Sequence, residues 1–183
     1  MADSARDLAT SEETPRHLVA EVIRGKPSLL PRPPALHARS SSRLGGELSG
    51  PFDRGRGGPG GWVLLDEPEL HLGADIIVPD LAGWRRSRMP EIPDVPFFTL
   101  PPDWVCEVLS PSTEQLDRAD KLPLFAENGV SHAWLLSPTA RTLEVFELDG
   151  RTFRLLSVFK NDERVRARPF DAFELELGAL WER

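Results

Sequence analysis

Two carboxylates and one lysine stand where their side chains could do chemistry together. Glu107 lies within the apolar stretch 104–109, and Asp80 lies within the apolar stretch 76–84. Burying an unpaired carboxylate is costly, so an acid among β-formers usually has a charged partner, a metal ion or an exposed place at a strand end. Lys121 lies in the charged, helical stretch that follows Glu107. Two acids in strands and a lysine from the next helix indicate a metal-dependent phosphodiesterase site.

The donor types in this set favour a hard cation. Hydrolysis of a phosphodiester requires neutralisation of phosphate charge, deprotonation of a water and stabilisation of the leaving oxyanion, and a divalent cation can serve all three needs. Carboxylates suit such a cation, whereas zinc prefers histidine and cysteine. The four histidines are scattered without ligand spacing, and there is one cysteine. The sequence therefore predicts Mg²⁺ or Mn²⁺ as the cofactor.

The elements that must position these residues alternate between strands and two long helices. Residues 35–48 have helical spacing. A second helix is predicted from about residue 116 to residue 128, with Pro123 expected to kink it or to shift its start. Strands are predicted at 17–24, 28–31, 62–65, 69–72, 76–78, 81–84, 104–109, 133–136, 142–147 and 153–159. The predicted fold class is α/β (α+β), with a restriction-endonuclease-like mixed central β-sheet and a helix on each side.

Two other segments have alternative interpretations. The glycine-rich segment 50–61 contains Arg54 and Arg56 and reads as a flexible surface loop or as a mobile basic loop that touches phosphate. The tail 170–181 is expected to form a short edge strand or a helical turn.

Length and composition predict one domain, at 15–183, after a polar and acidic segment, 1–14, that is expected to be disordered. A single cysteine suits a reducing cytosol, so the predicted location is cytoplasmic. No apolar run approaches the length of about 18 residues that a membrane span needs. The net charge of −7 argues against an extended nucleic-acid-binding surface, because phosphate contacts rely on Lys and Arg.

A specific string links the chain to a known family. Glu107-Val108-Leu109-Ser110-Pro111-Ser112-Thr113 is followed by Asp117 and Lys121, with Pro79-Asp80 upstream. With this string, the chain resembles the Uma-two restriction endonuclease family of the PD-(D/E)XK nuclease-like superfamily, over about residues 18–180. A lone Pro-Asp pair or a lone glutamate would carry no such signal.

The resemblance implies a role for each residue. Asp80 matches the first acid and Glu107 the second, and together they would bind the metal ion. The superfamily pattern places its lysine two residues after the second acid, where this chain has Leu109. Lys121 of the following helix takes that place, and it would orient or activate the attacking water, since the pKa of a lysine falls when it is partly desolvated. Glu47 on the first helix matches, weakly, a third acid found in several superfamily members.

Neighbouring polar residues have simpler interpretations. Asp75 is a possible additional ligand, but it would share a face with Asp80 only if the strand bends. Asp117 is expected to form an i,i+4 salt bridge with Lys121. The hydroxyl cluster 110–113 is expected to cap the following helix rather than to act as a nucleophile.

The leading prediction is an Mg²⁺-dependent endonuclease that acts on DNA and forms a homodimer, because cutting both strands of a duplex usually takes two such sites. A catalytically silent nucleic-acid-binding or scaffold protein with the same fold is the alternative. A metal-dependent hydrolase of a smaller phosphoester is a third possibility. The residues that would bind the substrate are not identifiable from the sequence.

Overall fold

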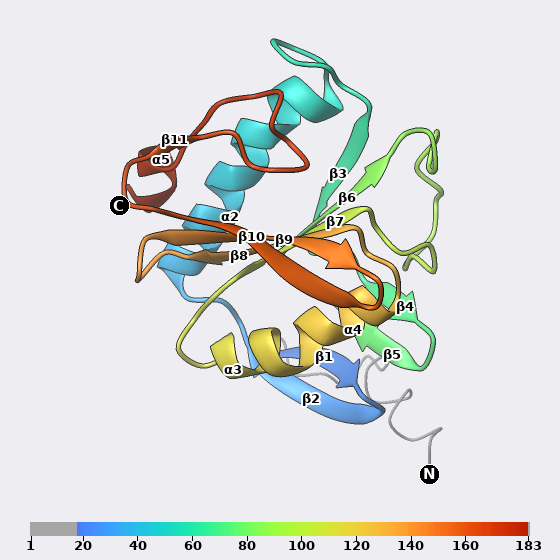
Figure 1. Ribbon diagram of the computed structural model, residues 1–183. Coiled ribbons are helices and arrows are strands. Elements are labelled where there is room, and N and C mark those ends of the chain that lie inside the picture. The colour runs from blue at the N-terminus through green and yellow to red at the C-terminus, as the bar shows by residue number, and fades with distance from the viewer. Residues whose placement is uncertain (1–17, 183) are drawn as a thin grey trace.

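A six-stranded sheet forms the centre of the protein (Figure 1). The computed structural model describes residues 18–182, so the segment 1–14 that was predicted to be disordered lies outside the described residues. The strands of the sheet are β3 (Trp62–Asp66), β6 (Leu81–Arg85), β7 (Trp104–Val108), β8 (His132–Ser137), β9 (Thr142–Asp149) and β10 (Thr152–Lys160). Their order is β10-β9-β8-β7-β6-β3.

Strands β7 and β8 are parallel, whereas the other neighbours in this sheet are antiparallel. Parallel strands cannot be joined by a tight hairpin, so the chain crosses over between them through a helical segment. That segment consists of α3 (Glu114–Leu116), a π-helical turn η2 (Asp117–Lys121) and α4 (Leu122–Glu127). The acid Glu107 on β7 and Lys121 on the following helical segment therefore belong to one βαβ unit.

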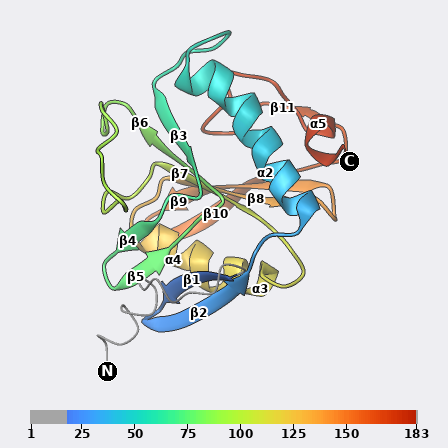
Figure 2. The same cartoon turned by 180° about the vertical axis from the view of Figure 1, so that it is seen from behind.

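The two faces of the sheet are covered by different helices (Figures 1 and 2). Helix α2 (Ala35–Leu48) buries Leu44 and Leu48 in a cluster with Cys106 of β7. Helix α4 buries Leu124 in a second cluster with Val105 of β7. Successive side chains of a strand point to opposite faces, so β7 lies in the middle of both clusters. The predicted mixed central sheet with a helix on each side is confirmed.

A smaller four-stranded sheet packs beside the crossover helix, in the order β2-β1-β5-β4. Its strands are β1 (Leu18–Ile23), β2 (Lys26–Pro31), β4 (Leu70–Leu72) and β5 (Asp75–Ile77). Strands β1 and β2 form a hairpin that pairs along its full length, but β1 and β5 share only the pair Val22 and Ile76. The hairpin is therefore held mainly by its own two strands and is joined to the rest of the smaller sheet by one pair of residues.

The crossover helix tolerates Pro123 through a change of helix type. Proline lacks a backbone N–H, and in an α-helix interior its ring meets the carbonyl four residues earlier. The chain instead passes through the wider turn η2, where the N–H of Leu122 donates to the carbonyl of Asp117, and Pro123 lies in the first turn of α4. The helical segment thus runs from 114 to 127 without a break, and its predicted start near residue 116 was close.

The glycine-rich segment 50–61 is only partly a surface loop. Its first residues belong to a second π-helical turn, η1 (Ser49–Asp53), and Phe52 is buried. The Phe52 ring lies 4.7 Å from the ring of Phe170, between centroids. The surface-loop prediction is therefore wrong for this part, because a distant aromatic residue provides the partner. The tail contains both predicted elements, which are β12 (Leu175–Glu176), paired with β11 (Arg164–Val165), and α5 (Gly178–Trp181).

No helix within residues 18–182 is long and apolar enough to cross a membrane.

Two glycines offer a test of packing in the sheet. A Cβ atom on Gly83 of β6 would lie 2.8 Å from Leu64 Cδ2 and 3.2 Å from Trp104 Cε3. We expect Gly83→Ala to lower the free energy of unfolding by about 1–3 kcal/mol, because overpacking strains a close-packed core. Gly46→Ala, on α2, meets nothing within 4 Å, and it should raise the stability by up to about 1 kcal/mol through helix propensity. Denaturant unfolding of both variants checks this, and equal effects would contradict it.

Candidate functional site

A cavity of about 210 Å³ lies where the hairpin β1–β2 meets the central sheet. Its walls come from the hairpin, the segment 31–34, the start of α2, the residue before β6, the end of β7, the loop 110–113 and η2. The elements are far apart in the sequence but adjacent in the fold. Asp80, Glu107 and Lys121 all line this cavity.

The sheet brings Asp80 and Glu107 together at the cavity floor. Cys106 and Val108 pack toward α2, so the alternation along β7 turns Glu107 to the opposite face, toward η2. Leu81 of β6 pairs with Cys106 in antiparallel register, and one further step of that register places Asp80 opposite Glu107. Asp80 Oδ2 accepts a hydrogen bond of 2.7 Å from the backbone N–H of Val108, which holds its carboxylate at the end of the two strands.

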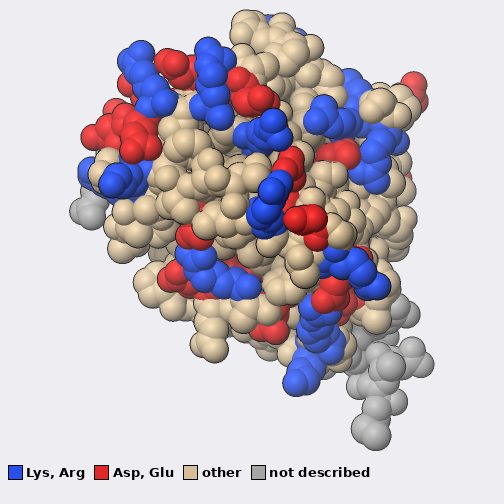
Figure 3. Space-filling view, viewed as in Figure 1, with Lys and Arg blue, Asp and Glu red and all other residues tan. Residues whose placement is uncertain are grey.

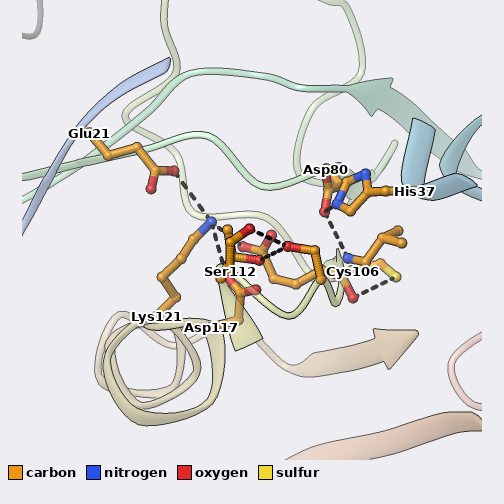
Figure 4. Close-up of polar contacts among 11 residues, drawn as sticks. Glu21, His37, Asp80, Cys106, Ser112, Asp117 and Lys121 are labelled. Carbon is orange, nitrogen blue, oxygen red and sulfur yellow. Dashed lines mark hydrogen bonds and ion pairs between the residues drawn. The ribbon is translucent and has the colours of Figure 1, made fainter. Parts of the chain in front are cut away.

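Lys121 reaches the same place from the crossover helix (Figure 4). Its Nζ atom lies 2.7 Å from Glu107 Oε1, 3.3 Å from Glu21 Oε1 and 3.8 Å from Asp117 Oδ1. The predicted i,i+4 pair with Asp117 is present but is the longest of these contacts. The ammonium group is therefore held mainly by two glutamates from two different sheets.

Glu21 of β1 is a site residue that the sequence analysis missed. It is 1% exposed, and its Oε1 atom accepts a hydrogen bond of 2.8 Å from the backbone N–H of Val78. Its Oε2 atom is buried and has no hydrogen-bond partner among the described residues. A signal was available, because Glu21 is an acid in the apolar run 18–23, the same feature that drew attention to Glu107.

His37 of α2 is a second missed residue. Its Nε2 atom lies 3.2 Å from Asp80 Oδ2, and its Nδ1 atom is buried without a hydrogen-bond partner in the described part of the chain. The side chain therefore contacts the same carboxylate oxygen that accepts the hydrogen bond from Val108. Sequence spacing gave no hint of this, because His37 and Asp80 are brought together only by the packing of α2 on the sheet.

The cavity collects more negative than positive charge. Its lining contains five acids, Glu21, Glu67, Asp80, Glu107 and Asp117, against the two cationic side chains of Arg32 and Lys121. Burial raises the pKa of Glu107 well above its usual range, and the neighbouring acids add to this against the opposing effect of Lys121. Burial also raises the pKa of Asp117, to about 6. The site thus favours the binding of protons or of another cation.

The pKa of Lys121 moves in the direction opposite to the one expected from the sequence. Burial acts to lower it, but the carboxylates of Glu107, Glu21 and Asp117 outweigh burial and hold the pKa well above its usual range. The expectation of a lowered pKa was therefore wrong, because it considered desolvation without the surrounding acids. A raised pKa favours the ammonium form of Lys121 over the neutral amine that a general base requires.

The oxygen donors in the cavity fit a hard divalent cation that takes only one or two of its ligands from the protein. Mg²⁺ typically keeps several waters and binds through one or two carboxylates, and Asp80 and Glu107 supply two. The excess of buried carboxylate charge, with Glu21 Oε2 left without a partner, is what such a cation would offset. Within residues 18–182, no three His, Cys, Asp or Glu side chains gather into a metal-binding cluster. The cavity therefore fits a cation that is bound by two carboxylates and completes its coordination with water.

The two additional acids predicted from the sequence lie elsewhere. Glu47 is half-buried on α2 and does not line the cavity. Asp75 begins β5, also outside the cavity, and its Oδ1 atom accepts a hydrogen bond from the backbone N–H of Gly25 in the hairpin turn. The structure does not bring either residue to Asp80 and Glu107.

The hydroxyl cluster before α3 also differs from expectation. Thr113 is the N-cap residue of α3, but its side chain makes no capping hydrogen bond. Ser110 Oγ instead lies 3.0 Å from both Ser112 Oγ and Thr113 Oγ1. The predicted side-chain cap is wrong, and the hydroxyls form a small network at one wall of the cavity.

Comparisons with known proteins point to one family. Residues 6–178 match the family model Uma2, described as "Putative restriction endonuclease". Among solved structures, the chain is similar to the crystal structure of "a putative nuclease belonging to DUF820" from Anabaena variabilis, with 23% sequence identity and a TM-score of 0.77. The match covers 98% of this chain and 96% of that one. No curated protein matches the sequence. At this identity the structural likeness shows a shared fold.

Proposed function

The chain belongs to the Uma2 restriction endonuclease family, as its sequence resemblance predicted, and we propose that it is a divalent-cation-dependent nuclease that hydrolyses phosphodiester bonds of DNA. One observation carries the proposal. Asp80, Glu107 and Lys121 come from three separate elements and line one cavity, with a surplus of buried carboxylates around one ammonium group.

In this proposal Asp80 and Glu107 hold Mg²⁺ or Mn²⁺. When bound, the cation supplies neutralisation of phosphate charge and a lower pKa for water in the site. The backbone N–H of Val108 and the ring of His37 both contact Asp80 Oδ2 and so hold the carboxylate in place. Fixed ligands matter, because a partner that orients a metal ligand typically changes affinity or activity about 10–100-fold.

Lys121 stabilises the negative charge that grows on the phosphate oxygens as the bond to the leaving oxygen breaks. A preorganised cation in a site shielded from water does this better than a solvated one. Glu21 and Asp117 keep the ammonium group charged and in place. Cleavage of both strands of a duplex would need two copies of the site, so a homodimer is part of the proposal for that substrate.

The decisive experiment is cleavage of DNA by the purified full chain with Mg²⁺, Mn²⁺ or EDTA. We expect cleavage with either metal ion and none with EDTA. Thermal unfolding gives an independent readout, since a ligand that binds only the folded state at about 100 times its Kd adds about 2.7 kcal/mol of stability. A protein that neither cleaves DNA nor gains thermal stability with any divalent cation would contradict the proposal.

A further inference from the structure

The reacting groups lie deep in the cavity. The side chains of Glu21, Lys121 and Glu107 are 1%, 3% and 5% exposed. A phosphodiester must therefore enter a recess of about 210 Å³ to reach them. The major groove of a duplex alone is about 12 Å wide, so an intact duplex is too wide to enter a recess of this size, whereas a single strand can enter it. The depth of the site favours a strand that is already unpaired.

Part of the cavity wall is apolar. It includes Val19 of β1, Leu30 of β2 and Pro34 before α2, while the same hairpin also contributes Glu21. An unpaired nucleotide can place its base or sugar against such a wall, since unpaired bases are free to contact protein side chains. In a duplex the base faces are covered by stacking, so the outer rim offers mostly phosphate and sugar. The combination of apolar and charged lining residues suits the base or sugar and the phosphate of one unpaired nucleotide.

The charges around the cavity do not suit a duplex. Its cationic side chains are Arg32 and Lys121, against five acids, which are Glu21, Glu67, Asp80, Glu107 and Asp117. Duplex DNA has a higher charge density than a single strand, so its binding depends more strongly on Lys and Arg contacts to phosphates. On the face shown in Figure 3, basic and acidic side chains alternate and form no continuous basic surface. The net charge of −7 adds to this.

From these observations we infer that the site takes an unpaired nucleic-acid strand in preference to an intact duplex. This inference rests on the proposed nuclease function and names its substrate class. One nucleotide sits with its base or sugar against the wall formed by Val19, Leu30 and Pro34, and its phosphate faces Lys121. Single-stranded DNA and single-stranded RNA both meet this description.

Binding and cleavage test the inference separately. Fluorescence anisotropy with Ca²⁺ present compares one labelled sequence as single-stranded DNA, as single-stranded RNA and as duplex DNA. Cleavage with Mg²⁺ or Mn²⁺ compares circular single-stranded DNA with supercoiled duplex. We expect affinity at least about tenfold higher for an unpaired strand, which is the scale of one lost base contact, and faster cleavage of single strands. The DNA and RNA arms show which sugar is preferred.

The results of the binding and cleavage assays separate the substrate class from the nuclease activity. Selective binding of unpaired strands without cleavage supports the substrate class and overturns the proposed nuclease activity. Cleavage of duplex as fast as of single strands supports the nuclease and overturns the substrate class. Absence of selective binding to any unpaired strand overturns the inference, whatever is cleaved.

Neighbouring leucines of β2 provide a matched pair of variants. Leu30 lines the cavity, whereas Leu29 is 55% exposed and lies outside it. Asparagine is neutral, so it changes polarity without repelling phosphate. We expect Leu30→Asn to weaken binding of unpaired strands about five- to tenfold, as loss of an apolar base contact would, and Leu29→Asn to change it less than twofold. Equal effects of the two substitutions would show that the cavity wall does not contact the strand.

Discussion

Replacing Lys121 by methionine is expected to reduce cleavage by at least about a hundredfold, the scale of a lost preorganised electrostatic contact, and to destabilise the fold. Methionine keeps most of the apolar stem but removes the charge. The carboxylates of Glu107, Glu21 and Asp117 then remain buried without their common partner. Removal of one partner from a buried ion pair typically costs about 3–5 kcal/mol. Steady-state cleavage and denaturant unfolding measure the two effects.

The loss of stability in Lys121→Met should depend on pH. Burial raises the pKa of Glu107 and raises that of Asp117 to about 6, and both carboxyls are protonated more readily in the folded than in the unfolded state. A raised pKa of an acid in the folded state makes stability greatest at low pH and lowers it as pH rises through that pKa. We therefore expect the variant to lose less stability near pH ~5 than near pH ~8.

Lys160→Met is the matched control, because Lys160 is exposed at the end of β10. The same change of side chain there should leave cleavage unaltered and shift stability by less than about 0.5 kcal/mol. If Lys121→Met were as stable and as active as this control, Lys121 would not compensate the buried acids.

Replacing Glu107 by glutamine is expected to reduce cleavage by a similar factor, at least about a hundredfold, with little loss of stability. Glutamine has nearly the same shape but carries no charge. Because burial already raises the pKa of Glu107, and Lys121 keeps Glu21 and Asp117 as partners, removal of the charge relieves part of the negative surplus. The gain in thermal stability from Mg²⁺ or Mn²⁺ should disappear in this variant.

Glu47→Gln serves as the control for Glu107→Gln. The substitution is the same, but Glu47 does not line the cavity. Its cleavage and its metal-dependent stabilisation should equal those of the unchanged protein. A Glu107→Gln variant that still gains stability from the metal ion would show that the cation binds elsewhere, and a defect in Glu47→Gln would restore that residue to the site.

Local patterns were sufficient for much of the fold. The helix predicted at 35–48 is α2, with the same bounds, because its apolar spacing repeats with the helical period. The strands predicted at 142–147 and 153–159 are β9 and β10, which pair as a hairpin around Asp149-Gly150, a dipeptide that favours a tight turn. The apolar run 104–109 correctly predicted strand β7, and the acid within it, Glu107, lines the cavity.

Features that depend on partners distant in the sequence were missed. Phe52 is buried because Phe170 comes to it from the C-terminal tail. His37 reaches Asp80 only because α2 packs on the sheet. Glu21 carried a visible signal, but its pairing with Lys121 requires the hairpin to border the crossover helix.

The sequence by itself determined most of the helices and strands and three residues of the site, because side-chain periodicity and backbone preference act between near neighbours. Only the tertiary structure decided which acids surround Lys121, and hence that its pKa is raised and not lowered. Electrostatic interactions act through space, so the charge state of a buried group depends on every element packed against it.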